Sequence, residues 1–403
     1  MEATRIRLAE GVHLTYLPAR KFKTSLLSAQ FVTPLRRETA GANALLAAVL
    51  RRGTVSCPDM GALSAKMDNL YDASIDYTVR KKGENQCVGF VASFIDDRYA
   101  PGGERLLEPA AALLGELICD PVTYHGRFVP EYFESEKTNL LEAIRSLIND
   151  KRDWADSRLL RALCDGEAYA VPRLGDEETV DKLQALKVYT QYRDLISTAP
   201  LEIIYSGSAD LERVKQALAV AFATLPREEV RVISTAAPHV CRESVQHVED
   251  VLDVTQGKLG MGFSCGSDDM PALLMGNTLF GGSSNSKLFL NVREKLSLCY
   301  YASSLYHRQK GLITVSSGIE FQNYQRAYDE IMVQLEAVQK GELEDWELEG
   351  ARSTLLNSYA TVGDSQGKLE NFYLGQAATG QHETPADLAR AIQDMTAERI
   401  CRA

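Results

Sequence analysis

Histidine, closely spaced cysteine and long apolar runs are all scarce in this chain of 403 residues. No two of its six histidines stand four residues apart, so the zinc-binding motifs H-E-x-x-H and H-x-x-E-H are both missing. The nearest two of its eight cysteines, Cys241 and Cys265, are 24 positions apart, which excludes zinc ribbons, iron–sulfur clusters and C-x-x-C redox sites. The longest nearly apolar stretch, 41–50, is far shorter than the roughly 18 residues of a membrane span, and the first residues form no apolar export segment. We therefore expect a cytoplasmic protein.

Positive charge is also in deficit. The chain has 44 Lys and Arg against 55 Asp and Glu, a net charge of −11, and its longest basic run is Arg80–Lys82. Such a balance repels phosphate backbones, so nucleic acid is not an expected ligand. An apolar content of 45% is enough to bury the cores of two or three domains at this length.

Other catalytic patterns receive little support. There is no G-x-S-x-G elbow, although a Ser/His/Asp triad assembled in space is not excluded by spacing. His239 and His247 stand eight apart in a predicted loop-to-strand segment, where solvated residues are favoured over metal ligands. The loop 281–287 resembles a phosphate loop only superficially, because it follows a helix and has no glycine before Lys287. By itself it reads as a turn that needs glycine dihedral angles.

An internal repeat organises the chain. In each half an alternating strand leads into an apolar helix and a glycine, then a tyrosine-containing run, a Lys-Gly pair, a second strand and two further helices. The predicted segments are 25–33, 42–50, 86–94, 104–119 and 130–148 in the first half, and 256–264, 271–280, 312–319, 324–338 and 342–359 in the second. The pattern predicts an α+β fold of two homologous domains, each a mostly antiparallel sheet with helices packed on one face.

The expected domain boundaries follow from this repeat. Residues 1–228 form the first domain, 229–239 a polar linker, and 240–403 the second domain. The first domain closes with a strand at 201–205 and a helix capped by Asp210. The second ends in a helical stretch without a matching last strand, so either the sequence is a piece of a longer chain or this domain lacks one strand.

The segment after the glycine loop has an ordinary structural interpretation. Leu288, Val292 and Leu296 would face inward on a helix, while Arg293 lies in solvent and Tyr300 opens a strand.

Taken as a whole, the chain resembles the pitrilysin and mitochondrial-processing-peptidase family of inverzincin metallopeptidases. The resemblance rests on the duplicated halves, on Gly-Gly-Ser-Ser-Asn-Ser-Lys-Leu-Phe at 281–289 followed by Val-Arg-Glu-Lys-Leu-Ser-Leu-Cys-Tyr-Tyr-Ala at 292–302, and on the helix ending in Arg52-Gly53-Thr54. It implies that the two domains form a bowl-shaped half-chamber.

The same resemblance marks a degenerate metal motif. Active members carry H-x-x-E-H on the first-domain helix, and the matching positions here are Ala44, Ala47 and Ala48. The third ligand of the family, a glutamate, falls at Glu142 or, with a one-residue shift, at Ala143. The resemblance therefore implies no metal and no cofactor in this chain, with zinc expected on a partner subunit.

A second part of the family's site is retained. The resemblance implies that Arg293 and Tyr300 bind the substrate carbonyl and stabilise the charge that develops on it. It also implies that the loop residues Gly281, Gly282, Ser283 and Ser284 contact an extended peptide substrate.

The implied function is a zinc-free, substrate-binding subunit of a heterodimeric zinc metallopeptidase. The partner would be a similar-sized chain carrying H-x-x-E-H, and the peptide would add as a strand to a sheet edge. The net negative charge favours basic or neutral peptides.

Two alternatives remain. The chain could be a pseudo-peptidase that acts as a scaffold or accessory binding protein, as in elongation factor P modification, with which some similar bacterial members are associated. The three alanines support this reading, as do Ser297 and Cys299, where family members usually have small residues. An autonomous hydrolase with an unrelated site is the third reading, so whether the protein takes part in catalysis stays open.

Overall fold

The computed structural model describes residues 3–233, 241 and 244–403. These residues form two compact units. The first comprises Met1–Arg145, Val171–Thr235 and Ser365–Gln381, and the second comprises Ser146–Ala170, Ala236–Asp364 and His382–Ala403. Each unit therefore includes one segment from the opposite half of the sequence. Residues 234–239 of the predicted linker lie outside the described part of the chain.

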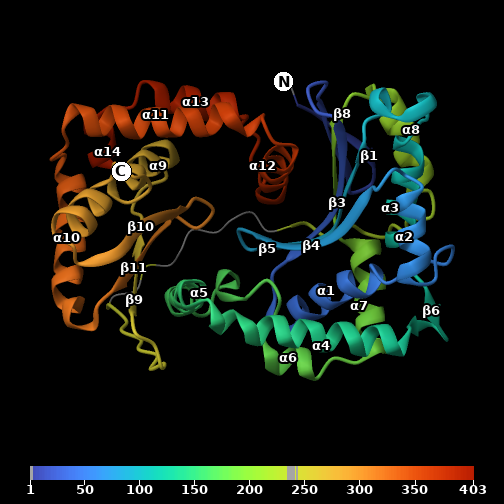
Figure 1. Cartoon of the computed structure of the whole chain (residues 1–403), viewed down its shortest axis with the longest axis horizontal. Helices are drawn as coiled ribbons and strands as arrows, with labels where there is room; N and C mark the ends of the chain where they lie inside the picture. The colour runs from blue at the N-terminus through green and yellow to red at the C-terminus, as the bar shows by residue number, and fades with distance from the viewer. Residues whose placement is uncertain (1–2, 234–240, 242–243) are drawn as a thin grey trace. The chain divides into compact units, whose positions relative to one another are not determined.

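A six-stranded sheet forms the centre of the first unit (Figure 1). Its order is β1 (Thr4–Ala9), β2 (Val12–Pro18), β8 (Leu201–Gly207), β3 (Thr24–Pro34), β5 (Asn85–Ile95) and β4 (Ser74–Lys82). All neighbours are antiparallel except β2 and β8, which run parallel. Among the described residues β4 has β5 as its sole strand neighbour, so it is an edge strand.

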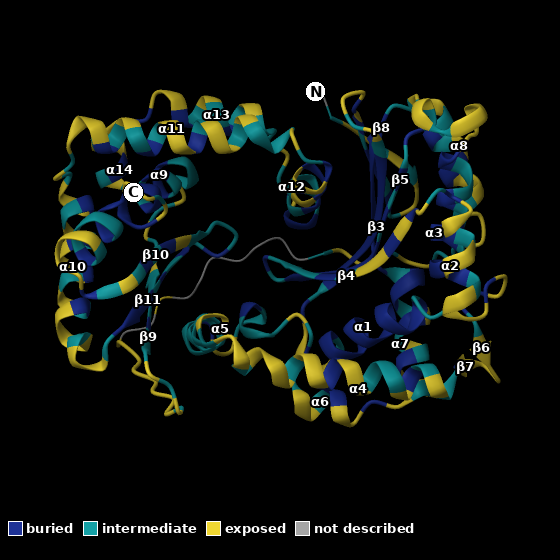
Figure 2. Cartoon of the chain, viewed as in Figure 1, coloured by how far each residue is buried: buried dark blue, intermediate teal, exposed yellow. Residues whose placement is uncertain are grey.

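Strand β3 is buried on both faces because its sequence alternates between two kinds of contact (Figure 2). Leu27, Ala29 and Phe31 belong to the apolar core, together with residues of the helices α1 (Arg37–Leu50) and α7 (Ala185–Thr198). Ser28 and Gln30, on the opposite face, make polar contacts instead. A continuous apolar layer and a polar layer thus lie on either side of one central strand.

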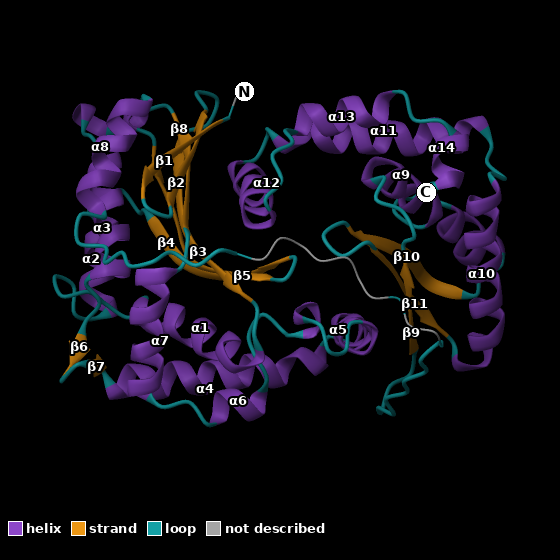
Figure 3. Cartoon of the chain, turned by 180° about the vertical axis from the view of Figure 1, so that it is seen from behind, coloured by secondary structure: helices purple, strands orange, loops and turns teal. Residues whose placement is uncertain are grey.

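Helices cover the apolar face of this sheet. In Figures 1 and 3, α3 and α8 lie side by side, and α1 packs against α7. The predicted cap at Asp210 is confirmed, because its side chain accepts a hydrogen bond from Arg213 N. The helices of this unit are α1 (Arg37–Leu50), α2 (Met60–Asp68), α3 (Leu107–Cys119), α4 (Pro130–Ser146), α6 (Glu177–Asp181), α7 (Ala185–Thr198) and α8 (Leu211–Ala221), and a small hairpin pairs β6 (Thr123–Tyr124) with β7 (Arg127–Phe128).

The polar face of the sheet is covered by α12 (Gln366–Thr379), which comes from the second half of the sequence. Glu370 on this helix is 2% exposed and accepts hydrogen bonds from Ser28 Oγ at 2.7 Å and Arg80 Nη1 at 2.5 Å. Gln366 Nε2 donates to the backbone oxygens of Thr24 at 3.0 Å and Ser206 at 2.8 Å. Polar groups therefore account for much of the specificity with which α12 docks.

Asp96 is a buried carboxylate at the end of β5. It accepts hydrogen bonds from Arg98 Nε at 2.8 Å, from Ser208 Oγ at 2.7 Å and from Ser25 Oγ at 3.1 Å. Burial alone raises the pKa of this carboxyl, but the hydrogen bonds from Arg98 and Ser208 outweigh it and hold the pKa below its ordinary value. The ionised form therefore stabilises the junction of β5 with the segment after β8.

The second unit has a smaller antiparallel sheet in the order β10 (Cys299–His307), β11 (Leu312–Ile319) and β9 (Gly257–Ser264). Helix α5 (Lys151–Leu163), from the first half of the sequence, packs against β9. A Cβ atom at Gly262 would lie 2.6 Å from Leu163 Cδ2, so this glycine permits the close approach. The other helices are α9 (Met270–Phe280), α10 (Tyr324–Lys340), α11 (Asp345–Val362), α13 (Pro385–Gln393) and α14 (Ala397–Arg402).

The predicted α+β class, with its mostly antiparallel sheets, is confirmed. The helix predicted over 130–148 ends earlier than expected, because α4 stops at Ser146 and a short 3-10 helix follows at Leu147–Asn149. The helical stretch predicted at 386–403 is divided into two helices by residues 394–396. No helix in the described ranges has both the length and the apolar character needed to cross a membrane.

Candidate functional site

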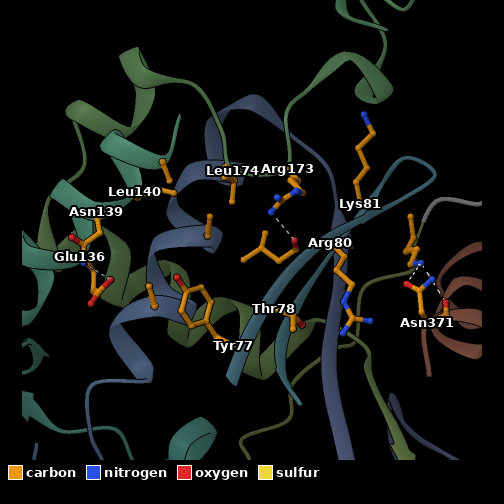
Figure 4. Close-up of a pocket in the computed structure, with 15 residues that line it drawn as sticks. Tyr77, Thr78, Arg80, Lys81, Glu136, Asn139, Leu140, Arg173, Leu174 and Asn371 are labelled. Carbon is orange, nitrogen blue, oxygen red and sulfur yellow. Dashed lines mark hydrogen bonds between the residues drawn. The ribbon is translucent and has the colours of Figure 1, made fainter. Parts of the chain in front are cut away.

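A cavity of about 750 Å³ lies within the first unit, around the edge strand β4 (Figure 4). Helices α1 and α4 and the loop before α6 contribute one side of its lining, and α12 contributes the other. The lining residues are Ala44, Ala48, Tyr77, Thr78, Val79, Arg80, Lys81, Lys82, Glu136, Asn139, Leu140, Ala143, Arg173, Leu174 and Asn371.

Two of the three predicted motif positions face this cavity. Ala44 and Ala48 stand one helical turn apart on α1 and both belong to the lining. Ala47 instead is fully buried in the apolar core, beside Phe31 and Phe90 of the sheet.

The structure also distinguishes the two candidate positions for the third ligand. Ala143 lines the cavity, whereas Glu142 is an exposed residue of α4 outside the lining. Methyl groups at positions 44, 48 and 143 offer no lone pair to a cation, so these residues do not fit a zinc ion. Across the described residues, no three His, Cys, Asp or Glu side chains gather in a way that could hold a metal.

The acidic residue of the cavity wall has structural partners. Glu136 Oε1 accepts a hydrogen bond from Arg52 Nε at 2.5 Å, and Glu136 Oε2 accepts one from Asn139 Nδ2 at 3.2 Å. This ion pair ties the end of α1 to α4. Burial, followed by the charge of Glu136, raises the pKa of the nearby Tyr77, which therefore remains a neutral hydrogen-bond donor at physiological pH.

Polar side chains extend the cavity on both sides of β4. On the α12 side, Lys82 Nζ donates to Asn371 Oδ1 at 2.7 Å, and Arg80 pairs with Glu370. On the other side, Figure 4 shows Arg173 reaching toward the strand, where its Nη1 donates to Val79 O at 3.1 Å. These basic residues were not predicted as site residues, although the run 80–82 was visible in the sequence.

Arg293 and Tyr300 lie in the second unit. Arg293 is on η5 (Leu288–Lys295), a π-helix, with its guanidinium 4.6 Å from the Phe289 ring centroid and Nε 3.5 Å from Glu294 Oε1. Tyr300 is the second residue of β10, which begins one position earlier than expected, and its hydroxyl donates to Glu320 Oε1 at 2.7 Å. That hydrogen bond raises the pKa of Tyr300 above its ordinary value.

The segment after the glycine loop differs from the predicted burial pattern at one position. Leu288 and Val292 are buried as predicted, but Leu296 is 37% exposed. The side chain of Arg293 is 41% exposed and Tyr300 is 60% exposed. Both groups are therefore accessible to a ligand from solvent.

The glycine loop follows α9. The turn expected at 281–287 does not use the left-handed dihedral angles that favour glycine, because neither Gly281, with a φ of −153°, nor Gly282 has a positive φ. Gly281 is required for close approach instead: an added Cβ would lie 2.6 Å from Ser304 N, which donates to Gly281 O at 2.9 Å. Gly282 and Ser284 are exposed, and Ser283 Oγ donates to Thr278 O at 3.4 Å. Of the two histidines that stand eight positions apart in the sequence, His239 lies outside the described residues and His247 is exposed.

The chain has two α+β units and a cavity beside α1, where alanines occupy the expected metal-ligand positions. Together these features define a metallopeptidase-like protein that lacks its metal ligands. Residues 182–355 match the family model described as the peptidase M16 inactive domain. A protein of Bacillus subtilis strain 168 described as the probable inactive metalloprotease YmfF is 33% identical over 400 residues, which cover 98% of this chain and 93% of the relative.

Two solved structures share the fold. A conserved protein from Enterococcus faecalis V583 has a TM-score of 0.87 at 26% identity, and the match covers 100% of this chain and 95% of that one. A peptidase M16 inactive domain from Pseudomonas fluorescens has a TM-score of 0.80 at 18% identity, covering 100% and 94%. The chain belongs to the M16 peptidase family, which is the pitrilysin family that the sequence resembles. The matched family model and the Bacillus subtilis relative are both described as inactive.

Proposed function

We propose that this protein is the zinc-free, substrate-binding subunit of a heterodimeric metallopeptidase. In this proposal a similar-sized family member carrying H-x-x-E-H supplies the zinc ion and the general base. The present chain supplies a peptide-binding surface, together with Arg293 and Tyr300 as donors that complete the partner's site. We place this complex in the cytoplasm, because all eight cysteines are free thiols.

One observation carries the proposal: the cavity is large while its ligand positions hold methyl groups. A volume of about 750 Å³ beside Ala44 and Ala48 has not been filled by larger side chains. Retention of the space without the metal chemistry favours binding over catalysis in this unit. Because the cavity surrounds the edge strand β4, an extended peptide can pair with that strand as an additional one.

Arg293 has the chemistry that transition-state stabilisation requires. Its side chain is partly open to solvent, and its planar guanidinium can donate several hydrogen bonds to an oxyanion. The loop 281–284 lies in the same unit as Arg293 and presents Gly282 and Ser284 to solvent. A peptide backbone passing this loop would meet donors and little steric obstruction.

Reconstitution with an H-x-x-E-H family member from the same genome tests the proposal. Cleavage of unstructured fluorogenic peptides by the pair should require zinc, and Arg293→Ala should reduce kcat/KM by about 10²- to 10³-fold, as for the loss of one oxyanion donor. Lys295→Ala, an exposed cation on the same π-helix, is the matched control and should retain full turnover. Size-exclusion chromatography must find the Arg293→Ala complex intact, and unchanged turnover in that variant would refute the proposal.

The scaffold alternative draws support from a different contact. Tyr300 already donates its hydroxyl proton to Glu320, so it can donate to a substrate carbonyl only by giving up that hydrogen bond. If the reconstituted pair binds peptides yet never cleaves them, the chain is an accessory binding protein, of the kind considered for elongation factor P modification. Tyr300→Phe separates the two functions, since it lowers turnover only where Tyr300 takes part in the chemistry.

A further inference from the structure

Two backbone acceptors on the open side of β4 already have side-chain donors. Ile75 O accepts a hydrogen bond from Arg51 Nε at 2.5 Å, and Val79 O accepts one from Arg173 Nη1 at 3.1 Å. In an antiparallel ladder every second residue directs its backbone groups to the same side, so Tyr77 shares the orientation of Ile75 and Val79. A peptide strand added to this edge would need the acceptor that Arg173 holds.

The position of Arg173 is fixed through its main chain rather than its side chain. Gln86, which is fully buried, donates from Nε2 to Arg173 O at 2.6 Å. The guanidinium itself belongs to an exposed residue and bonds to a neutral carbonyl. It can therefore rotate to another acceptor without disturbing the loop that carries it.

The charge of the cavity is opposite to that of the whole chain. Among its described lining residues, Arg80, Lys81, Lys82 and Arg173 are basic, whereas Glu136 is the acidic member. Glu136 is already paired with Arg52, and Arg80 is partly balanced by Glu370 beneath it. Low-dielectric walls strengthen such a local field, so a chain of net charge −11 presents a basic cavity here.

We propose that the occupant of this edge is an extended peptide segment bearing an acidic side chain, and that Arg173 selects it by exchanging Val79 O for the peptide carboxylate. The inference rests on the proposed function and reverses the expectation of basic or neutral peptides that net charge suggested. The peptide N–H replaces the guanidinium as donor to Val79 O. The guanidinium then bonds to a carboxylate, which is a stronger acceptor than the carbonyl it leaves.

A neutral peptide gains less from the same exchange. It also displaces Arg173 from Val79 O, but it leaves the guanidinium to water or to a weaker amide acceptor. A basic peptide adds repulsion from Lys81 and Lys82. We therefore expect a binding order of acidic, neutral and basic, with about tenfold or more between the first two.

Three peptides of about 12 residues, identical except for two Glu, two Gln or two Lys, allow a direct test with the full-length chain. Each carries a neutral dye, and binding is followed by fluorescence anisotropy. Arg173→Gln should abolish the preference for Glu over Gln, while Arg105→Gln, a matched control at an exposed arginine outside the cavity, should keep it. Raising NaCl to about 0.5 M should shrink the Glu advantage, since screening weakens the added ion pair.

The outcomes are distinguishable. Tighter binding of the Glu peptide that depends on Arg173 supports the inference. Equal binding of all three peptides, or a Glu preference that survives Arg173→Gln, overturns the selection by charge and leaves the proposed function standing. If no peptide binds, both fail. Circular dichroism of Arg173→Gln confirms that its fold is unchanged.

Discussion

Replacement of Glu370 by Gln should destabilise the first unit while leaving its packing almost unchanged. Glutamine has nearly the same size and keeps an oxygen acceptor for Ser28 Oγ, so the chief loss is the charge opposite Arg80. The side chains of Arg80 and Glu370 are 23% and 3% exposed, which places the pair mostly out of water. The perturbation therefore isolates one electrostatic interaction between α12 and β4.

The size of the effect follows from that burial. Two unit charges about 4 Å apart at an effective dielectric constant of about 20 attract by about 4 kcal/mol. Breaking a fully buried pair by removing one partner costs about 3–5 kcal/mol, and water reaching the partly exposed Arg80 recovers some of it. We expect Glu370→Gln to lower the free energy of unfolding by about 2–3 kcal/mol, and Glu370→Ala by about 1 kcal/mol more because Ser28 loses its acceptor.

The assay can separate the two units. Trp154 and Trp346 are the two tryptophans of the chain, and both lie in the second unit, whereas far-ultraviolet circular dichroism reports on both units. In urea, Glu370→Gln should lower the midpoint of the dichroism transition of the first unit more than that of the tryptophan transition. Adding Arg80→Met should restore part of the loss, because no unpaired charge then remains. A cost below about 1 kcal/mol, or no recovery in the double variant, would refute the reasoning.

Three further outcomes follow from the structure. The triple variant Ala44→His, Ala48→His, Ala143→Glu should bind Zn²⁺ with a dissociation constant of about 1 μM or below in isothermal titration calorimetry, because all three positions line one cavity. The variant with the two histidines alone should bind Zn²⁺ more weakly. Equal affinities of the two variants would mean that position 143 does not face the same point as positions 44 and 48. Because the pKa of Asp96 is lowered in the folded state, its carboxylate contributes stability above its ordinary pKa of about 4, and this contribution is lost as pH falls through the pKa of the folded protein. The urea midpoint of the wild type should therefore fall between pH 5 and pH 3, and that of Asp96→Asn should fall less steeply. Burial raises the pKa of Cys87 to about 12, so iodoacetamide at pH 8 should not alkylate this thiol in the native protein but should alkylate it in urea. Mass spectrometry measures the labelling, and rapid alkylation of Cys87 in the native protein would contradict its burial.

Strong local patterns let the sequence predict much of the fold. The strand predicted at 312–319 coincides with β11, and the helix predicted at 271–280 differs from α9 by one residue. The helical segment is a mostly apolar run between Asp269 and Gly281, and the strand segment is rich in β-branched residues and lies between Gly311 and Glu320. Such segments carry their own signal, independent of the rest of the chain.

Strand β4 and helix α12 were not predicted, and both belong to the candidate site. On β4 only Ile75 and Val79 are buried, so an edge strand rich in polar residues has a weak alternation. On α12 the docked face includes buried Gln366 and Glu370, which a hydrophobic pattern does not recognise. The residues that β4 and α12 contact are far away in the sequence, so a local sequence pattern cannot predict these contacts.

In the candidate site, too, local relations in the sequence were predicted and distant contacts were not. The alanine positions 44 and 48 followed from their spacing to Gly53, a local relation, and both line the cavity. The choice between positions 142 and 143 needed the structure, since a shift of one residue turns a helical side chain by about 100°. The contact of Arg173 with Val79 joins residues 94 positions apart and had no local signal.

The exchange of α5 and α12 between the two units has a consequence for biosynthesis. The polar face of the first sheet is completed by residues 366–379, which are translated after most of the second unit. Until they emerge, a nascent chain exposes Ser28 and Arg80 without their carboxylate partner, so an N-terminal fragment ending at the predicted linker would lack part of its own sheet cover. We expect the first unit to reach its final form only after residues 366–379 have been translated, so a chain that terminates before them should fold incompletely.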